Sequence, residues 1–169
     1  RERSSTRAEE ALLNAKVVGR WQSGAPLAVT PSEDDPELGA DKARNNDFQY
    51  AEDRRGLKCP LGAHARRGNT RDSFDDDGSV DVRLDRMIRR GTSYGPMLPD
   101  DAVEDDGIDR GIMFVCACTH LHRQFEFVKK KWLNDGIFSG APSERDPFVG
   151  PNDGTGTFTP QHGAHPSVG

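Results

Sequence analysis

The chain of 169 residues is long enough for one ordinary domain, but only 33% of its residues are hydrophobic and 7% aromatic. Its 18 glycines and 11 prolines predict long irregular connections. The net charge of −5 argues against general nucleic-acid binding and against binding to an anionic membrane surface, and no apolar segment reaches membrane-spanning length.

The first predicted element is a helix over residues 7–18. Thr6 and Glu9 have the spacing of a capping box, and alanine and leucine then recur at helical period until a glycine at position 19. Residues 19–38 are rich in glycine, proline and acidic side chains, which predicts a long surface loop. Residues 45–50 are polar and aromatic, with the alternation of a short strand.

The central stretch, residues 59–95, holds one histidine among many arginines. We expect residues 60–71 to form a loop or a short helix that presents His64, and the acidic residues 72–81 to form a turn or an insertion. The arginines in and beside this stretch are Arg54, Arg55, Arg66, Arg67, Arg71, Arg83, Arg86, Arg89 and Arg90. A locally positive pocket is therefore compatible with an acidic protein, although most of these arginines are expected to pair with nearby aspartates on the surface.

The clearest predicted strand covers residues 107–118, GIDRGIMFVCAC. Apolar side chains alternate toward both of its faces, which predicts a strand in the middle of a sheet. The residues that follow repeat at i, i+4, i+7 and i+11, the stripe of an amphipathic helix: Leu121, Phe125, Val128 and Trp132. A strand that runs directly into a helix indicates an α+β fold.

The cysteines do not predict a disulfide framework, because three of them cannot all pair within one chain. Cys59 and Cys116 are expected to be buried small hydrophobes. Cys116, Cys118, His120 and His122 form a C-x-C-x-H-x-H pattern suited to zinc or copper. On a straight strand its outer ligands would lie roughly 20 Å apart, which disfavours a tetrahedral site.

The surroundings of His64 favour an anionic cofactor instead. Several guanidinium groups close to one imidazole disfavour a cluster of metal ions, because cations repel each other. Haem fits such a place, since its iron takes one proximal histidine and its propionates need positive partners.

Several motifs occur in order along the chain: CPLGAHARRGNTRD, RMIRRGTSYG, RGIMFVCACTHLHRQFEFVKKKWLND, DPFVG and TGTFT. With them, most of residues 18–159 resembles the carboxy-terminal half of the dye-decolorizing (DyP-type) haem peroxidases. The resemblance implies an α+β fold with a ferredoxin-like antiparallel sheet and helices, in an incomplete copy of the family's haem-binding domain over residues 1–159. Residues 160–169 are expected to be a disordered tail.

The resemblance also implies roles for four residues. His64, in the motif CP-x-x-A-H-x-R-x-x-N, would be the proximal ligand of haem b, iron protoporphyrin IX. Arg89 would be the distal arginine that stabilises negative charge on the leaving oxygen of hydrogen peroxide, with Arg90 as the alternative. Arg66 and Arg71 are candidates to bind the propionates, and pairing with nearby aspartates is the alternative for both.

Two acids of the family are harder to place. An acid usually orients the proximal histidine, and the resemblance points to the junction between the apolar strand and the next helix, where Glu126 is the nearest candidate. The family's distal aspartate belongs to a G-x-x-D-G motif, and no such motif occurs in this chain. We therefore expect a chain that is cut at both ends.

The expected function is that of a haem-dependent peroxidase, which uses hydrogen peroxide to oxidise phenolic or dye substrates in one-electron steps. The alternative is a truncated haem-binding or scaffold module without turnover of its own. The expected partners are hydrogen peroxide, an aromatic reductant and either the missing amino-terminal half or a second copy of the chain. Nucleic acid and membranes are not expected partners.

Overall fold

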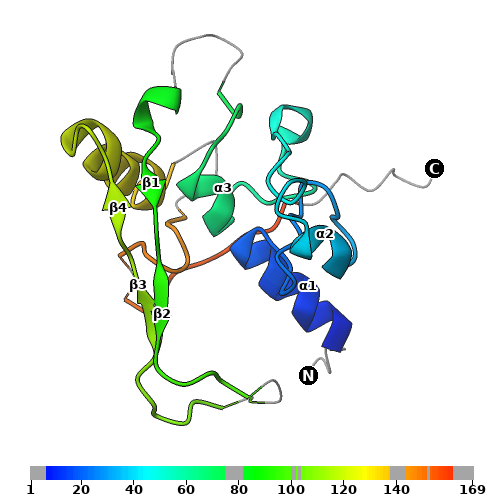
Figure 1. The fold of residues 1–169 in the computed structure, drawn as a ribbon. Helices are drawn as coiled ribbons and strands as arrows, with labels where there is room; N and C mark the ends of the chain where they lie inside the picture. The colour runs from blue at the N-terminus through cyan, green and yellow to red at the C-terminus, as the bar shows by residue number, and fades with distance from the viewer. Residues whose placement is uncertain are drawn as a thin grey trace.

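A computed structural model gives the fold and describes residues 7–74, 82–99, 102, 104–137, 144–151 and 153–161. Its α-helices are α1 (Arg7–Val18), α2 (Pro36–Ala40) and α3 (His64–Gly68), and its 3₁₀ helices are η1 (Ala51–Asp53) and η2 (Val82–Asp85). Its strands are β1 (Ile88–Arg89), β2 (Thr92–Tyr94), β3 (Gly111–Met113) and β4 (Cys116–Ala117), and two π-helices follow, η3 (His122–Glu126) and η4 (Val128–Leu133). Together they form an α+β fold, with α1, α2 and α3 on one side and the strands on the other (Figure 1).

The predicted first helix is confirmed as α1, while Thr6 lies outside the described residues. The helix ends at Gly19, which has a φ of +91° and donates its N–H to the Ala15 carbonyl. A side chain at Gly19 would come within 3.0 Å of the Ala65 Cβ. Glycine therefore serves both the left-handed turn and the close approach of α1 to α3.

Two hydrophobic clusters make up the described core. The larger lies beneath α1 and the loop before α3: Ala15, Trp21, Ala25, Leu27, Leu38, Tyr50, Cys59 and Ala63. The smaller joins η2 to η4 through Val82, Val128 and Trp132. Cys59 is buried as expected, and this burial raises the pKa of its thiol to about 12, whereas Cys116 is only partly buried.

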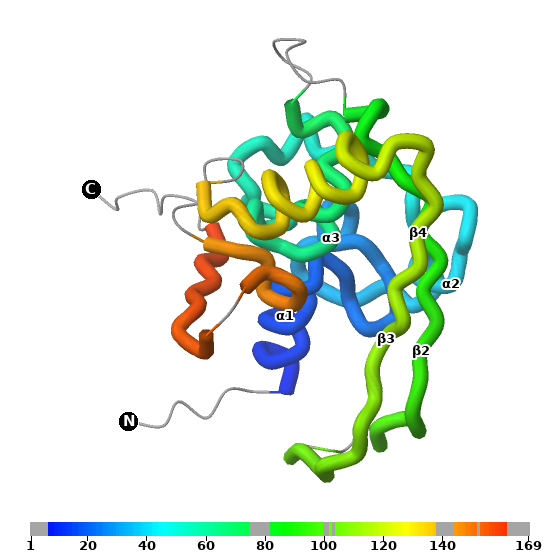
Figure 2. The backbone as a smooth tube through the Cα atoms, turned by 90° about the vertical axis from the view of Figure 1, so that its left-hand side faces the viewer, coloured from blue at the N-terminus to red at the C-terminus, as the bar shows by residue number. Residues whose placement is uncertain are grey.

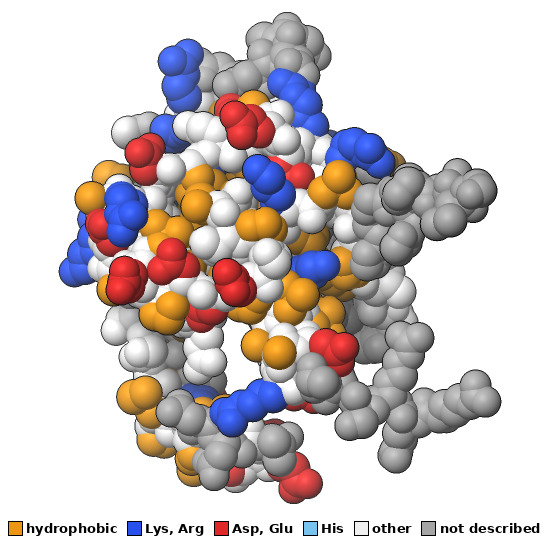
Figure 3. Space-filling model, turned by 90° about the vertical axis from the view of Figure 1, so that its right-hand side faces the viewer, with side chains coloured by type: hydrophobic (Ala, Val, Ile, Leu, Met, Phe, Trp, Pro, Cys, Tyr) orange, Lys and Arg blue, Asp and Glu red, His pale blue; other side chains and the backbone are white. Residues whose placement is uncertain are grey.

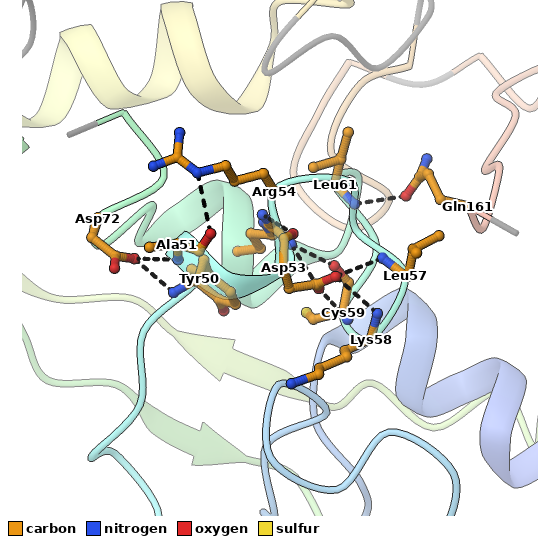
Figure 4. Close-up of polar contacts among 11 residues, drawn as sticks. Tyr50, Ala51, Asp53, Arg54, Leu57, Lys58, Cys59, Leu61, Asp72 and Gln161 are labelled. Atoms are coloured by element: carbon orange, nitrogen blue, oxygen red, sulfur yellow. Dashed lines mark hydrogen bonds and ion pairs between the residues drawn. The ribbon is translucent and has the colours of Figure 1, made fainter. Parts of the chain in front are cut away.

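The loop before α3 is organised by one buried carboxylate. Asp53 accepts backbone N–H groups from Leu57, Lys58 and Cys59 at 2.7, 3.1 and 2.9 Å (Figure 4). Arg66 adds an ion pair to the same carboxylate at 3.1 Å and donates to the Cys59 carbonyl at 2.7 Å. These contacts fix the chain where it enters α3.

A second buried arginine ties α3 to distant segments. Arg67 is fully buried, and its guanidinium donates to the carbonyl groups of Trp132, Glu144 and Asp135 at 2.8, 2.9 and 2.6 Å. The π-helix η4 accordingly packs against α3, and Figure 2 shows the π-helical segment running across it.

The strands form a narrow antiparallel ribbon. Ile88 pairs with Ala117 and Tyr94 with Gly111, and the pairs between them keep the same register. The predicted strand over residues 107–118 is thus present in part, but its predicted place in the middle of a sheet is wrong. Among the described residues it pairs with one neighbour only, and Ile112 and Phe114 are largely exposed.

The predicted helix after this strand is also present, but it is a π-helix, which has more residues per turn than an α-helix. Backbone bonds such as Glu126 N–H to the Leu121 carbonyl span five residues, as in a π-helix. Val128 and Trp132 are buried as the stripe predicts, whereas Leu121, which precedes the first residue of η3, is exposed.

The remaining predictions concern segments that the structure describes only in part. Of the acidic stretch 72–81, residues 75–81 lie outside the described residues, as do residues 162–169 of the expected tail. Gln161 accepts a hydrogen bond from the Leu61 N–H at 2.9 Å. No helix in the described part is long and apolar enough to cross a bilayer, and acidic and basic side chains intermingle on the face in Figure 3.

We predict that Arg67→Leu lowers the free energy of unfolding by about 3–5 kcal/mol, because three largely buried carbonyl groups lose their donors together. Urea unfolding followed by circular dichroism measures this loss. The matched control is Arg55→Leu at an exposed position, where a change within about 0.5 kcal/mol is expected. Equal midpoints for the two variants would show that Arg67 does not hold these segments together.

Candidate functional site

His64 is the first residue of α3, directly after the loop organised by Asp53. Its Nδ1 atom lies 3.0 and 2.9 Å from the two carboxylate oxygens of Asp146, a residue 82 positions away in the sequence. The side chain of His64 is 39% exposed, whereas that of Asp146 is fully buried. The imidazole is therefore anchored at one nitrogen and open to the surroundings elsewhere.

Asp146 is held as an ionised acceptor. Its Oδ1 also accepts the N–H groups of Phe148 and Val149 at 3.0 and 2.9 Å. Burial alone would raise the pKa of Asp146, but the hydrogen bond and charge of His64 and these two N–H groups outweigh burial and lower it. Because an ionised carboxylate only accepts hydrogen bonds, Nδ1 of His64 is the donor, and in the neutral form of this imidazole the lone pair is therefore on Nε2.

This acid does not come from the junction between the apolar strand and the next helix, to which the resemblance pointed. Glu126, the nearest acid at that junction, pairs with His122 at 2.8 Å and with Lys130 at 3.0 Å. The DPFVG motif, which carries Asp146, was the available signal in the sequence. Nothing local in that motif shows that it returns to α3.

His64 borders an open pocket of about 250 Å³. The other residues that line it come from the loop after α1, residues 46–50, α3 and β1: Arg20, Asn46, Phe48, Tyr50, Ala65, Gly68, Asn69, Arg71 and Arg89. This lining contains three arginines and no carboxylate. The described part of the site is thus strongly positive around one histidine.

The three arginines bond to neutral oxygens. Arg20 donates to the carbonyls of Gly24 and Asn45 and to the side chain of Asn46, and Arg89 donates to the Gly68 carbonyl at 2.7 Å. None of the described residues pairs a carboxylate with them. Burial lowers the pKa of each guanidinium, as expected for a cation without a nearby counter-charge. An anionic ligand would satisfy this pocket.

Arg71 adopts a conformation that costs energy. Its φ is +50°, and its guanidinium lies 3.8 Å from the centre of the Phe48 ring while donating to the carbonyls of Asn46 and Phe48. Non-glycine residues in the left-handed region often mark functional sites. The packing holds this side chain at the edge of the pocket.

Alternation along the ribbon separates Arg89 from its neighbour. Arg89 shares one face of the ribbon with Ile112 and Phe114, whereas Arg90 belongs to the opposite face. Only Arg89 of the two lines the pocket. Ile112 and Phe114 share the ribbon face of Arg89 but do not line the pocket.

Two further candidates from the sequence are Arg66 and the C-x-C-x-H-x-H pattern. Arg66 is buried against Asp53 and does not line the pocket, which favours its structural alternative. The C-x-C-x-H-x-H pattern receives no support, because no three His, Cys, Asp or Glu side chains in the described part of the chain could hold a metal ion.

Comparison with known proteins shows to which family this chain is related. No protein-family model matches the chain. It is 35% identical over 156 residues to a dye-decolorizing peroxidase of Mycetinis scorodonius, covering 88% of this chain and 30% of the relative. It is 36% identical over 166 residues to one of Auricularia auricula-judae, covering 89% and 32%. The chain belongs to the dye-decolorizing peroxidase family.

Solved structures agree with this relationship. A dye-decolorizing peroxidase from Pleurotus ostreatus superposes with a TM-score of 0.75 at 31% identity, over 92% of this chain and 37% of that one. One from Auricularia auricula-judae gives a TM-score of 0.76 at 33% identity, over 91% and 38%. The chain spans about a third of the length of its curated relatives.

We predict that Asp146→Asn lowers the free energy of unfolding at pH 6 by about 1–3 kcal/mol, because the charge-assisted bond to His64 is lost. The folded-state pKa of Asp146 is lowered, so its contribution is complete above pH about 4 and declines as the pH falls below that value. Urea unfolding of the parent and the variant at pH 6 and pH 3 measures both effects. A difference that stayed the same or grew at pH 3 would contradict the assignment.

Proposed function

We propose that this chain is the haem-binding part of a DyP-type peroxidase, with haem b in the pocket beside α3 and His64 as its iron ligand. The observation that carries the proposal is the anchored imidazole: Asp146 takes Nδ1 and leaves the Nε2 lone pair available next to three arginines. When bound, haem would supply the redox chemistry that reduces hydrogen peroxide and oxidises two aromatic molecules by one electron each.

The donor set fits this cofactor. Asp146 fixes the tautomer and the orientation of His64, and its negative charge increases the electron density on the imidazole. Phe148 packs edge-on against the His64 ring, with centroids 5.4 Å apart, and restrains its rotation. A neutral, oriented nitrogen donor is what haem iron needs on its proximal side.

We assign the propionates to Arg71 and Arg20. Both line the pocket and present half-buried guanidinium groups whose described partners are neutral oxygens. Arg66, the other residue expected for this role, is occupied by Asp53 and Cys59, so Arg20 takes its place in the proposal. A guanidinium fork matches the two oxygens of a carboxylate.

Arg89 remains the proposed distal arginine. Its fixed positive charge would stabilise the negative charge that develops on the leaving oxygen of hydrogen peroxide. Ile112 and Phe114, on the same face of the ribbon, would exclude water around it.

The aromatic reductant is proposed to be a phenol or a dye. One dye-decolorizing peroxidase that is 34% identical to this chain and superposes with a TM-score of 0.72 has been solved in complex with 2,6-dimethoxyphenol. Turnover also needs an acid that accepts and returns the peroxide proton, and the described pocket lining contains none. We therefore propose that the remainder of the fold supplies this acid, and that the chain alone binds haem without full turnover.

Haemin titration of the purified chain, followed by its Soret absorption, tests His64. We expect specific binding by the parent and at least a tenfold loss in His64→Ala. The matched control is His122→Ala, an exposed histidine paired with Glu126, which should bind like the parent. Failure of the parent to bind haemin, or equal losses in both variants, would refute the ligand assignment.

A second titration tests the propionate contacts. Arg20→Leu and Arg71→Leu should each weaken haemin binding by about 10- to 100-fold, the effect of one charge-assisted hydrogen bond of about 1.5–3 kcal/mol. With haemin dimethyl ester, whose propionates carry no charge, the parent and both variants should bind almost alike. Equal losses with both haems would mean that the arginines do not bind propionate.

A further inference from the structure

One cysteine lies directly across the ribbon from the arginine that lines the pocket. Cys116 on β4 pairs with Arg89 on β1. The next pair, Arg90 with Val115, carries a backbone hydrogen bond of 2.8 Å, so Arg89 and Cys116 form a non-hydrogen-bonded pair. The two side chains of such a pair share one face and approach each other most closely. The Cys116 thiol therefore lies beside a guanidinium group.

A second cysteine follows on the same face. Cys118 comes directly after Ala117, the last residue of β4, and the alternation of the strand places its side chain on the side of Cys116. Burial agrees with this placement, since Cys116 and Cys118 are partly buried and Ala117 between them is exposed. All three cysteines are free thiols, and Cys59 is fully buried. Two accessible thiols are thus neighbours beside Arg89.

The guanidinium of Arg89 is placed to assist chemistry at this sulfur. Burial lowers the pKa of Arg89, and the thiolate form of Cys116 acts in the opposite direction, so the two groups interact electrostatically. The thiolate is the form of cysteine that attacks peroxides. A fixed positive charge stabilises the hydroxide that leaves when the O–O bond breaks. Peroxide can reach Cys116, whereas Cys59 is closed to it.

We propose that Cys116 is a site of oxidation by hydrogen peroxide, and that Cys118 converts the oxidised thiol into a disulfide. The Cys116 sulfur attacks one peroxide oxygen, the O–O bond breaks, and the leaving hydroxide takes the thiol proton to become water, which leaves a sulfenic acid. The Cys118 sulfur then attacks that sulfur, the S–O bond breaks, and hydroxide leaves with the Cys118 proton as a second water. Two thiols lose two electrons, one peroxide is reduced, and no haem takes part.

The spacing of the two cysteines permits this disulfide under strain. Residues two apart on an extended strand have Cα atoms about 6.4–6.8 Å apart, which is the upper end of the usual range of about 4.4–6.8 Å in disulfides. Cys118 lies outside β4, so the chain can turn there without separating β4 from β1. Strained disulfides are reduced easily, and a small thiol would therefore reverse the modification.

Mass spectrometry of the haem-free chain tests the disulfide. The reduced chain is treated with one equivalent of hydrogen peroxide at pH 7, in the presence of a chelator that removes trace metals. We expect the loss of two hydrogen atoms from the tryptic peptide of residues 111–123, which contains Cys116 and Cys118, and its recovery with dithiothreitol. An unchanged peptide, a disulfide that includes Cys59, or a disulfide between two chains would overturn the inference.

Two single variants show which thiol reacts first. In Cys118→Ser the sulfenic acid at Cys116 has no second thiol to meet, so dimedone should trap it. In Cys116→Ser the labelling of Cys118 should be at least tenfold slower, because Arg89 is the cross-strand partner of Cys116. Equal labelling rates in the two variants would contradict the order of the two steps.

The part played by the guanidinium is tested in the Cys118→Ser background. Arg89→Leu should slow the labelling of Cys116 at least fivefold, because the leaving hydroxide loses its positive partner. The matched control is Arg90→Leu, which removes the same charge from the opposite face of the ribbon and should react like the parent. Circular dichroism should show the same folding for both variants. Equal rates in the two would overturn the assignment of Arg89 to this reaction.

Because these reactions contain no haem, their outcome is independent of the proposed function. A chain that forms the Cys116–Cys118 disulfide but does not bind haemin would keep this inference and lose the haem assignment. A chain that binds haemin through His64 but leaves both thiols unoxidised would keep the haem assignment and lose this inference.

Discussion

The buried guanidinium of Arg67 is the contact on which the site depends. It binds the backbone carbonyls of Trp132, Asp135 and Glu144, and so holds these three residues against α3. Asp146 follows two residues later and meets His64, three residues before Arg67 in the same short helix. Without this link, the sequence separation of 82 residues between His64 and Asp146 would be costly to close.

Neighbouring arginines divide the structural work and leave the pocket free for a ligand. Arg66 pairs with Asp53 and thereby fixes the loop that precedes α3. Arg67 binds carbonyl groups of segments that come later in the chain, such as that of Glu144. Both guanidinium groups therefore bond to atoms of the protein and hold the fold together. Arg20, Arg71 and Arg89 instead bring positive charge to the pocket beside His64, with neutral oxygens as their described partners. An anion with two carboxylates would match the arginines that line this pocket.

The local features could be predicted from the sequence, and the distant ones could not. The helix over residues 7–18 and the alternation along residues 111–117 are properties of neighbouring residues, and motif resemblance was enough to propose His64 and Arg89. Asp146 and Arg20 reach the site only through tertiary contacts that no local pattern encodes. The prediction that the strand over residues 107–118 lies in the middle of a sheet was wrong for a related reason. The alternation of its apolar side chains looks the same whether this chain covers them or another segment does.

The most direct test of the account is the resonance Raman spectrum of the ferrous, haem-loaded protein, in which the iron–histidine stretching frequency reports on the proximal imidazole. We predict a band that is absent from His64→Ala and shifted to lower frequency in Asp146→Asn, because the ligand loses its negatively charged partner. A band that persists in His64→Ala, or that keeps its frequency in Asp146→Asn, would contradict the claim that the Asp146-anchored His64 is the iron ligand.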